Sequence, residues 1–138
     1  MARIVGLDFG TVRIGVAISD EKQIIARPLG ILHNKSDFFS QLQKLLKQEG
    51  AIEKIIVGLP LKLSGQDSHM TQNARQFAKK LEENLHLPIE LWDERLTSAF
   101  VERSLVDAGV RRKQRAALSD TLSAVLILQS YLDRKGIL

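Results

Sequence analysis

Three carboxylates stand out because each is flanked by apolar sequence, where an unpaired charge is costly to bury. They are Asp8, Glu94 and Asp120. If three carboxylates converged without a counterion, they would repel one another and their pKa values would rise. Convergence makes chemical sense around hard divalent cations, which bind oxygen ligands. Two such ions about 3.5–4 Å apart can stabilise the attacking and leaving oxygens of a phosphoryl displacement. The three residues therefore predict a metal-dependent phosphoryl-transfer site.

The turn after Asp8 carries groups that suit a phosphate ligand. Gly10 lets the backbone turn and lets another group approach closely. Thr11 supplies a hydroxyl and Arg13 a guanidinium, and both groups bind phosphate oxygens. The alternative is a strand that ends in a turn with an exposed Asp8, since short motifs also arise without a function. The stretch predicts a metal or phosphate site at a hairpin.

A basic run at 111–115 follows the predicted third helix. Its positive charges could bind phosphates that flank the reacting one. Charge runs are also common in solvated linkers, which is the alternative for this segment.

The composition is that of one globular domain, residues 1–138, of which 44% are hydrophobic. The 20 Lys and Arg exceed the 16 Asp and Glu, giving a net charge of +4, compatible with a nucleic-acid partner. With five Phe, one Trp and one Tyr, a base-stacking platform of the single-strand-binding type is not expected, and recognition by backbone charge fits better. There are no cysteines, no membrane-length apolar stretch and no signal-peptide pattern, which leads us to expect a cytoplasmic protein.

The first third of the chain predicts three strands joined by short turns. Two apolar strands fill the stretch 4–19, and a third runs over 24–32, where Pro28 indicates an edge strand or a break. Such a succession predicts an antiparallel meander. A helix then follows, with Ser36 as its N-cap and Gly50 at its C-terminal stop.

The rest of the chain alternates strands and helices. We expect strands at 54–58 and 88–92, and helices at about 68–85 and from Thr97 or Ser98 to about 108. The loop after 58 is of the kind in which α/β folds bind ligands. Because side chains alternate along a strand, only one of Asp93 and Glu94 can join Asp8. The last helix is expected to be apolar all round and buried, with Asp120 near its start, where a capping or helix-dipole role is the alternative.

Four segments, taken together and in order, resemble the YqgF/RuvX family of bacterial RNase H-like nucleases. They are Asp8–Ala17, Ile56–Leu61, Trp92–Ser98 and Ser119–Leu132, and they span most of the chain. The resemblance implies an α/β RNase H-like fold, a mixed five-stranded sheet in the order 3-2-1-4-5 flanked by helices. It also implies catalytic carboxylates Asp8, Glu94 and Asp120 with Mg²⁺ or Mn²⁺. The family is described as acting in 5′-end maturation of 16S ribosomal RNA precursors, and was earlier described as resolving Holliday junctions.

On this resemblance, Asp8 is expected to bridge two metal ions, while Glu94 and Asp120 each bind one. The residues expected to contact substrate are Gly10, Thr11, Arg13, Lys62, Arg95, Thr97, Arg111, Arg112 and Lys113. Water would attack the phosphorus of structured RNA and leave a 5′-phosphate and a 3′-hydroxyl.

Three other functions remain open from the sequence. A DNA-junction resolvase with the same fold would need a symmetric dimer, whereas the sequence is equally compatible with a monomer. A nucleic-acid-binding protein without catalysis would keep the basic surface and dispense with the metal. An ATPase of the actin and sugar-kinase type shares the D-x-G-T turn, but it needs a second related domain, and 138 residues leave no room for one.

Overall fold

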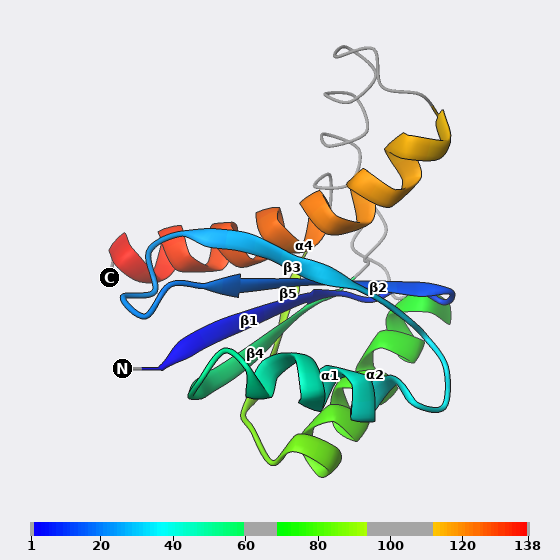
Figure 1. Ribbon diagram of the computed structural model, residues 1–138, viewed down its shortest axis with the longest axis horizontal. Helices are drawn as coiled ribbons and strands as arrows, with labels where there is room; N and C mark the ends of the chain where they lie inside the picture. Colours follow the sequence, from blue (N-terminus) through cyan, green and yellow to red (C-terminus); the bar gives the residue numbers. More distant parts are fainter. Residues whose placement is uncertain (1, 60–68, 94–111, 138) are drawn as a thin grey trace.

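The computed structural model describes residues 2–59, 69–93 and 112–137 (Figure 1). Its elements are β1 (Arg3–Asp8), β2 (Arg13–Ser19), β3 (Ala26–His33), α1 (Phe38–Lys47), β4 (Ile52–Leu59), α2 (His69–Leu85), β5 (Ile89–Asp93) and α4 (Arg112–Ile137). The helix expected between 97 and 108 lies outside the described residues.

The five strands form one mixed sheet in the order β3-β2-β1-β4-β5. β1, β2 and β3 pair antiparallel through short turns, which confirms the predicted meander. β4 and β5 are added parallel to β1, each reached through a helical crossover. Pro28 lies in the edge strand β3, beside a register shift between Val16 and Ala17, so the missing N–H of the proline costs the sheet little.

Helices α1 and α2 cover one face of the sheet (Figure 1). Val5 and Leu7 of β1 point into this layer, where they join Phe38 and Leu42 of α1 and Leu81 of α2. These five side chains are essentially inaccessible to solvent, and they form part of the larger of two hydrophobic clusters. Helical spacing in the sequence predicts a buried stripe on α2 made of Met70, Ala74, Phe77, Ala78, Leu81 and Leu85. The structure confirms it for Ala74, Phe77, Ala78 and Leu81, which are buried, and for Leu85, which is partly buried, while the side chain of Met70 is outside the described atoms.

Helix α4 covers the opposite face and packs across β1, β2 and β3 (Figure 1). A β-carbon added to Gly6 of β1 would lie 2.7 Å from Leu128 Cβ and 3.3 Å from the Ala124 carbonyl oxygen. The helix therefore lies against the strand at a distance that only glycine permits. Ser123 and Ala124 are buried in this contact, as their small size predicts.

The helix starts differ from the sequence prediction. Asp37, not Ser36, is the N-cap of α1, and its side chain makes no capping hydrogen bond. α4 begins at Arg112, so Asp120 lies more than two turns inside the helix and the N-cap interpretation is wrong. The favourable helical propensity of residues 112–118, rich in Arg, Lys, Gln, Ala and Leu, accounts for the early start.

The expectation that α4 is buried on all sides is also wrong for its described side chains. Leu122 and Ser130 are exposed, while the pairs at 123–124, 127–128 and 131–132 are buried. One stripe of the helix faces the sheet and the other faces solvent. In the described parts of the chain, no helix is long and apolar enough to cross a membrane.

Candidate active site

Asp8 is the last residue of the central strand β1, and its side chain is half-buried. Along β1, the side chains of Val5 and Leu7 face α1 and α2, whereas Ile4 belongs to the cluster beneath α4. Because side chains alternate along a strand, Asp8 belongs with Ile4 and Gly6 on the α4 face. The candidate active site is therefore at the carboxyl end of β1, on the side of the sheet that α4 covers.

Both cross-strand neighbours of Asp8 are glycines. Asp8 pairs with Gly15 of β2 on one side and with Gly58 of β4 on the other. Neither neighbour has a side chain, so no cross-strand side chain lies directly beside the Asp8 carboxylate, which is itself engaged in an interaction. The sequence analysis gave Gly15 no role in the site and placed Gly58 only at the start of a loop expected to border the substrate groove. Their positions in the two apolar strands were the available signal, since an isolated strand glycine often marks close approach of another group.

The end of β5 is in register with Asp8 across the sheet. Gly58 of β4 pairs with Trp92, and Leu59 pairs with Asp93, the last residue of β5. The Trp92 ring packs edge-on against the Tyr131 ring of α4 at a centroid distance of 5.5 Å, so Trp92 faces the same side of the sheet as Asp8. Glu94 follows β5 directly and lies outside the described residues.

The register of α4 relates Asp120 to Asp8. Gly6 lies against Ala124 and Leu128, and α4 runs antiparallel to β1, with its C-terminal end near the start of that strand (Figure 1). Asp8 is two residues beyond Gly6, or about 6.6 Å along β1. Asp120 precedes Ala124 by four residues, or about 6 Å along α4. The helix position of Asp120 is therefore displaced from Gly6 toward the carboxyl end of β1, where Asp8 lies, although its side chain is outside the described atoms.

Two contacts fix α4 to both edges of the sheet. On the β3 side, the Gln129 side chain accepts a hydrogen bond from the Ala26 N–H at 2.9 Å and donates one to the Ile24 carbonyl oxygen at 2.9 Å. On the β5 side, Trp92 Nε1 donates to Ser130 Oγ at 3.3 Å. These anchors hold the helix in one register over β1, and with it the backbone position of Asp120.

The turn after Asp8 is shaped by contacts with its own neighbours. A β-carbon at Gly10 would run into the Arg13 carbonyl oxygen, and the φ angle of Gly10 is not left-handed, so glycine is required here for space rather than for φ. Thr11 is exposed at the tip of the turn, and Arg13 is half-buried at the start of β2, where it is already engaged in an interaction.

Asn34, which the sequence analysis missed, holds this turn from the end of β3. Its side-chain amide donates to the Gly10 carbonyl oxygen at 2.9 Å, and its backbone N–H donates to the Val12 carbonyl oxygen at 2.8 Å. An asparagine just after a strand is a common loop residue, so its spacing gave no signal.

Most of the predicted basic contacts lie outside the described residues. Arg112 and Lys113 occupy the first turn of α4, so this part of the basic run is helical rather than a linker, and their side chains are not described. Lys62, Arg95, Thr97 and Arg111 are outside the described residues. The side chains that are described contain no group of three or more His, Cys, Asp or Glu that could hold a metal, and the carboxylates of Glu94 and Asp120 are not among them.

Solved structures with a similar fold include RuvC proteins. The T. thermophilus RuvC in complex with a Holliday junction substrate matches with a TM-score of 0.55 and 12% identity, over 99% of this chain and 97% of that chain. A second Thermus thermophilus RuvC structure matches with a TM-score of 0.52 and 12% identity, over 97% of this chain and 96% of that chain. Together with the strand order, these matches identify the fold as RNase H-like, as expected.

Curated relatives are more similar in sequence. A protein from Koribacter versatilis is 47% identical over 98% of this chain and 89% of its own length, and one from Protochlamydia amoebophila is 43% identical over 97% and 95%. A Bacillus cereus relative is 42% identical over 96% and 99%. All three carry the name "Putative pre-16S rRNA nuclease". A family model described as "RuvX: Holliday junction resolvase" matches residues 2–134. The chain is therefore a member of the RuvX family of nucleases.

Proposed function

We propose that this protein is a metal-dependent phosphodiester hydrolase that acts on structured RNA, in the 5′-end maturation of 16S ribosomal RNA precursors. The observation that carries the proposal is the position of Asp8 at the end of β1, beneath α4 and between Gly15 and Gly58. The names of the curated relatives support the RNA substrate.

The residues fit a site for hard divalent cations. Carboxylate oxygens are ligands that Mg²⁺ and Mn²⁺ prefer, and both cross-strand neighbours of Asp8 are glycines, which have no side chain to compete with an ion. We propose that Asp8 is shared by two ions and that Glu94 and Asp120 each bind one. An extended chain that continued for two residues past Trp92 would bring position 94 to the face that carries Asp8, which favours Glu94 over Asp93. When bound, the two ions would supply an activated water and offset the charge on the leaving oxygen.

The turn after Asp8 would hold the phosphate that is cut. The hydroxyl of Thr11 and the guanidinium of Arg13 are donors that suit phosphate oxygens, and Gly10 lets the substrate backbone approach closely. We propose that the remaining basic and polar residues bind flanking phosphates, which predicts salt-sensitive affinity. They are Lys62, Arg95, Thr97, Arg111, Arg112 and Lys113. Cleavage would leave a 5′-phosphate and a 3′-hydroxyl.

Resolution of four-way DNA junctions is the second candidate. The description of the family model and the junction in the RuvC complex favour it. A resolvase would act as a symmetric homodimer in order to cut two strands in matched positions, whereas the RNA nuclease can act as a monomer. In either case we propose a single nuclease domain over residues 1–138. Action on a ribosomal RNA precursor would place the protein in the cytoplasm.

The test is cleavage of labelled 5′-extended 16S precursor RNA and of a four-way DNA junction, each with Mg²⁺, Mn²⁺ or EDTA. Asp8→Asn removes the proposed metal ligand with almost no change in volume. Asp37→Asn is the matched control, because it removes an exposed carboxylate from the start of α1, in the layer on the other side of the sheet.

Metal-dependent RNA cleavage that is lost in Asp8→Asn and kept in Asp37→Asn would support the proposal. If the protein makes paired nicks in the DNA junction and leaves the RNA intact, the result would favour the junction resolvase over the RNA nuclease. If the protein binds a substrate in a salt-sensitive way but cleaves neither under any condition, it would be a nucleic-acid-binding protein without catalysis. Equal activity of Asp8→Asn and wild type would remove the role of Asp8 and point to a contaminating nuclease.

A further inference from the structure

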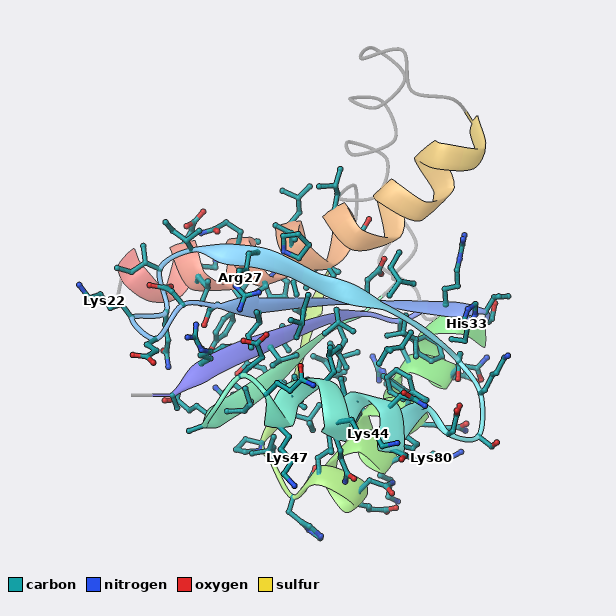
Figure 2. All side chains as sticks on the ribbon, in the orientation of Figure 1. Lys22, Arg27, His33, Lys44, Lys47 and Lys80 are labelled. Carbon is teal, nitrogen blue, oxygen red and sulfur yellow. The ribbon has the colours of Figure 1, made fainter. Side chains whose placement is uncertain are left out.

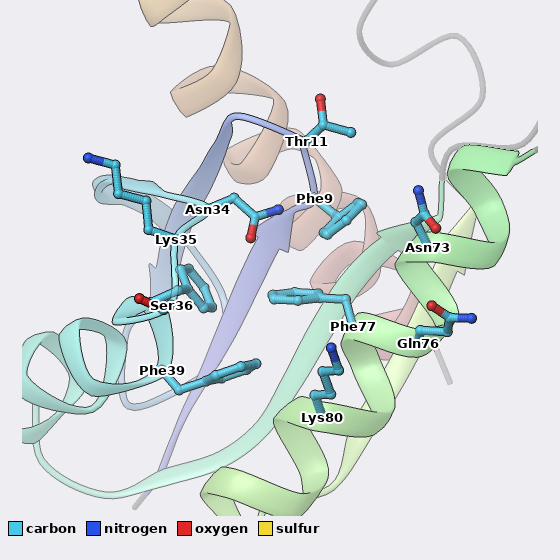
Figure 3. A pocket seen from close by; sticks show the side chains of 11 residues that line it. Phe9, Thr11, Asn34, Lys35, Ser36, Phe39, Asn73, Gln76, Phe77 and Lys80 are labelled. Atoms are coloured by element: carbon cyan, nitrogen blue, oxygen red, sulfur yellow. The ribbon is translucent and has the colours of Figure 1, made fainter.

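A pocket of about 500 Å³ lies on the face of the sheet opposite α4 (Figure 3). Four segments line it: the turn after β1, the loop between β3 and α1, the first residues of α1, and one face of α2. Its volume is within the range of about 300–1,000 Å³ that is usual for pockets that bind small molecules or cofactors. The sequence analysis did not anticipate this pocket.

The pocket has an aromatic wall. Phe9, Phe38, Phe39 and Phe77, four of the five phenylalanines in the chain, line it. The rings of Phe9 and Phe77 are 4.9 Å apart between centroids, and those of Phe39 and Phe77 are nearly parallel at 6.0 Å. Phe9, Phe38 and Phe77 are buried, whereas Phe39 is only partly buried, so Phe39 is the ring that a planar group in the pocket can contact. The composition, with few aromatic residues, had predicted recognition by backbone charge and no base-stacking platform, so a stacking site at this pocket departs from that prediction.

The rim of the pocket is polar and positively charged. Lys80 extends beside Phe77 toward the pocket, whereas Lys35, on the opposite rim, extends away from the phenylalanine rings (Figure 3). Asn73 and Gln76 add amide groups, which both donate and accept hydrogen bonds. None of the described residues that line the pocket carries a carboxylate. An aromatic wall with amides and two ammonium groups is complementary to a planar heterocycle attached to a phosphate.

The pocket is adjacent to the candidate active site through the backbone. Phe9, in the wall of the pocket, directly follows Asp8, and Thr11 of the same turn lines the pocket. A strand of nucleic acid whose phosphate lies at the end of β1 could therefore continue over this turn and into the pocket. Because the pocket adjoins the candidate active site, a segment of the substrate strand fits it better than a free nucleotide does.

We propose that the pocket binds one nucleotide of a single-stranded segment of the RNA substrate, next to the phosphate that is cut. The base packs against the ring of Phe39, with its edge near Asn73 and Gln76, while Lys80 holds the adjoining phosphate and Lys35 a neighbouring one. The proposal rests on the proposed function, because it assigns the pocket to the same RNA. It implies that the enzyme requires an unpaired nucleotide beside the cleavage site and cuts fully paired RNA poorly.

Binding is measured in EDTA, so that the result is independent of cleavage. The probe is a short single-stranded RNA that carries 2-aminopurine, whose fluorescence falls when the base stacks on an aromatic ring. The pocket variants are Phe39→Leu, which keeps an apolar side chain but removes the ring, and the double variant Lys35→Gln/Lys80→Gln. The control is Lys44→Gln/Lys47→Gln, which removes the same charge from the last turn of α1 (Figure 2), and neither of these residues lines the pocket.

We expect quenching with wild type that is lost in Phe39→Leu, together with binding that is about 5-fold weaker or more. The Lys35→Gln/Lys80→Gln variant is expected to weaken binding and to lower the salt slope by about 0.7 for each phosphate that it no longer neutralises. The Lys44→Gln/Lys47→Gln control should bind like wild type. Circular dichroism of each variant checks that the fold is kept.

Three outcomes would overturn the proposal. They are equal quenching in Phe39→Leu and wild type, equal loss of affinity in the pocket variants and the control, and displacement of the RNA probe by AMP at micromolar concentration, which would assign the pocket to a free nucleotide. Pocket-dependent RNA binding by a protein that cuts no substrate would instead refute the proposed catalysis and keep the pocket as an RNA site. The two proposals therefore fail in different ways.

Discussion

Asn34 Nδ2 donates a hydrogen bond to the Gly10 carbonyl oxygen at 2.9 Å, across 24 residues of chain. This contact joins the end of β3 to the turn that follows Asp8. Because the backbone N–H of Asn34 also bonds Val12, one residue holds both sides of the turn. The turn then positions Thr11 and the end of β1 for the proposed chemistry.

The first prediction is that Asn34→Asp impairs both stability and cleavage. The substitution keeps the size of the side chain but replaces the donor with an acceptor that faces the Gly10 carbonyl oxygen. We expect a loss of about 1–3 kcal/mol in the free energy of unfolding, measured by urea denaturation, and a reduced rate of RNA cleavage. Asn84→Asp removes a comparable amide bond, from Asn84 to the Lys80 carbonyl oxygen, at an exposed site and should cost no more than about 0.5 kcal/mol. Equal effects of the two variants would show that Asn34 has no special role.

The second prediction concerns the contact between β1 and α4. Gly6→Ala would force a methyl group to within 2.7 Å of Leu128 Cβ, so the helix must shift. We expect a loss of about 1–3 kcal/mol in stability and a fall in activity, since Asp120 moves with the helix. Gly30→Ala is the matched control, because its nearest neighbour is Leu45 Cδ2 at 4.0 Å, and it should be tolerated. A Gly6→Ala protein with wild-type stability would contradict the close packing described above.

The third prediction is that divalent metal stabilises the folded protein through Asp8. A ligand that binds only the folded state raises its stability, by about 2.7 kcal/mol at a hundred times the Kd. Wild type should therefore unfold at a higher temperature in Mn²⁺ than in EDTA, as measured by calorimetry. Asp8→Asn should show little or no such difference. A metal-induced shift of the same size in both proteins would mean that the ion binds elsewhere.

The fourth prediction is a loss of stability in acid through Asp20. The backbone N–H groups of Ile25 and Ile24 donate to Asp20 Oδ1 at 2.9 and 2.7 Å, and they lower the pKa of this carboxyl below 3.8. Since the pKa is depressed in the folded state, the contribution to stability is complete above 3.8 and is lost as the pH falls through the folded pKa. Urea denaturation should show wild type more stable than Asp20→Asn near neutral pH, with the difference shrinking in acid. A difference that does not change with pH would refute the assignment.

Local pattern was enough to predict most elements of the fold. Apolar runs ended by turn residues identified the five strands, and the 3.6-residue spacing of Ala74, Phe77, Ala78 and Leu81 identified α2. Boundaries were less predictable, as at the starts of α1 and α4, because a helix start depends on small differences in capping and propensity. The strand order came from the resemblance to a family, and the paired register in the structure confirms it.

The sequence by itself determined which residue types are available for chemistry, and it predicts Asp8, Glu94 and Asp120 as oxygen ligands, with Thr11 and Arg13 as donors for phosphate. Only the tertiary structure decided how some of them are brought together. The pairing of Asp8 with Gly15 and Gly58, the register of α4 over Gly6, and the clamp of Asn34 on Gly10 all join residues far apart in the chain. The same holds for the four phenylalanines around the pocket. Such contacts depend on how whole strands and helices pack against one another. The spacing of residues along one strand or helix does not predict which residues of another element they will contact.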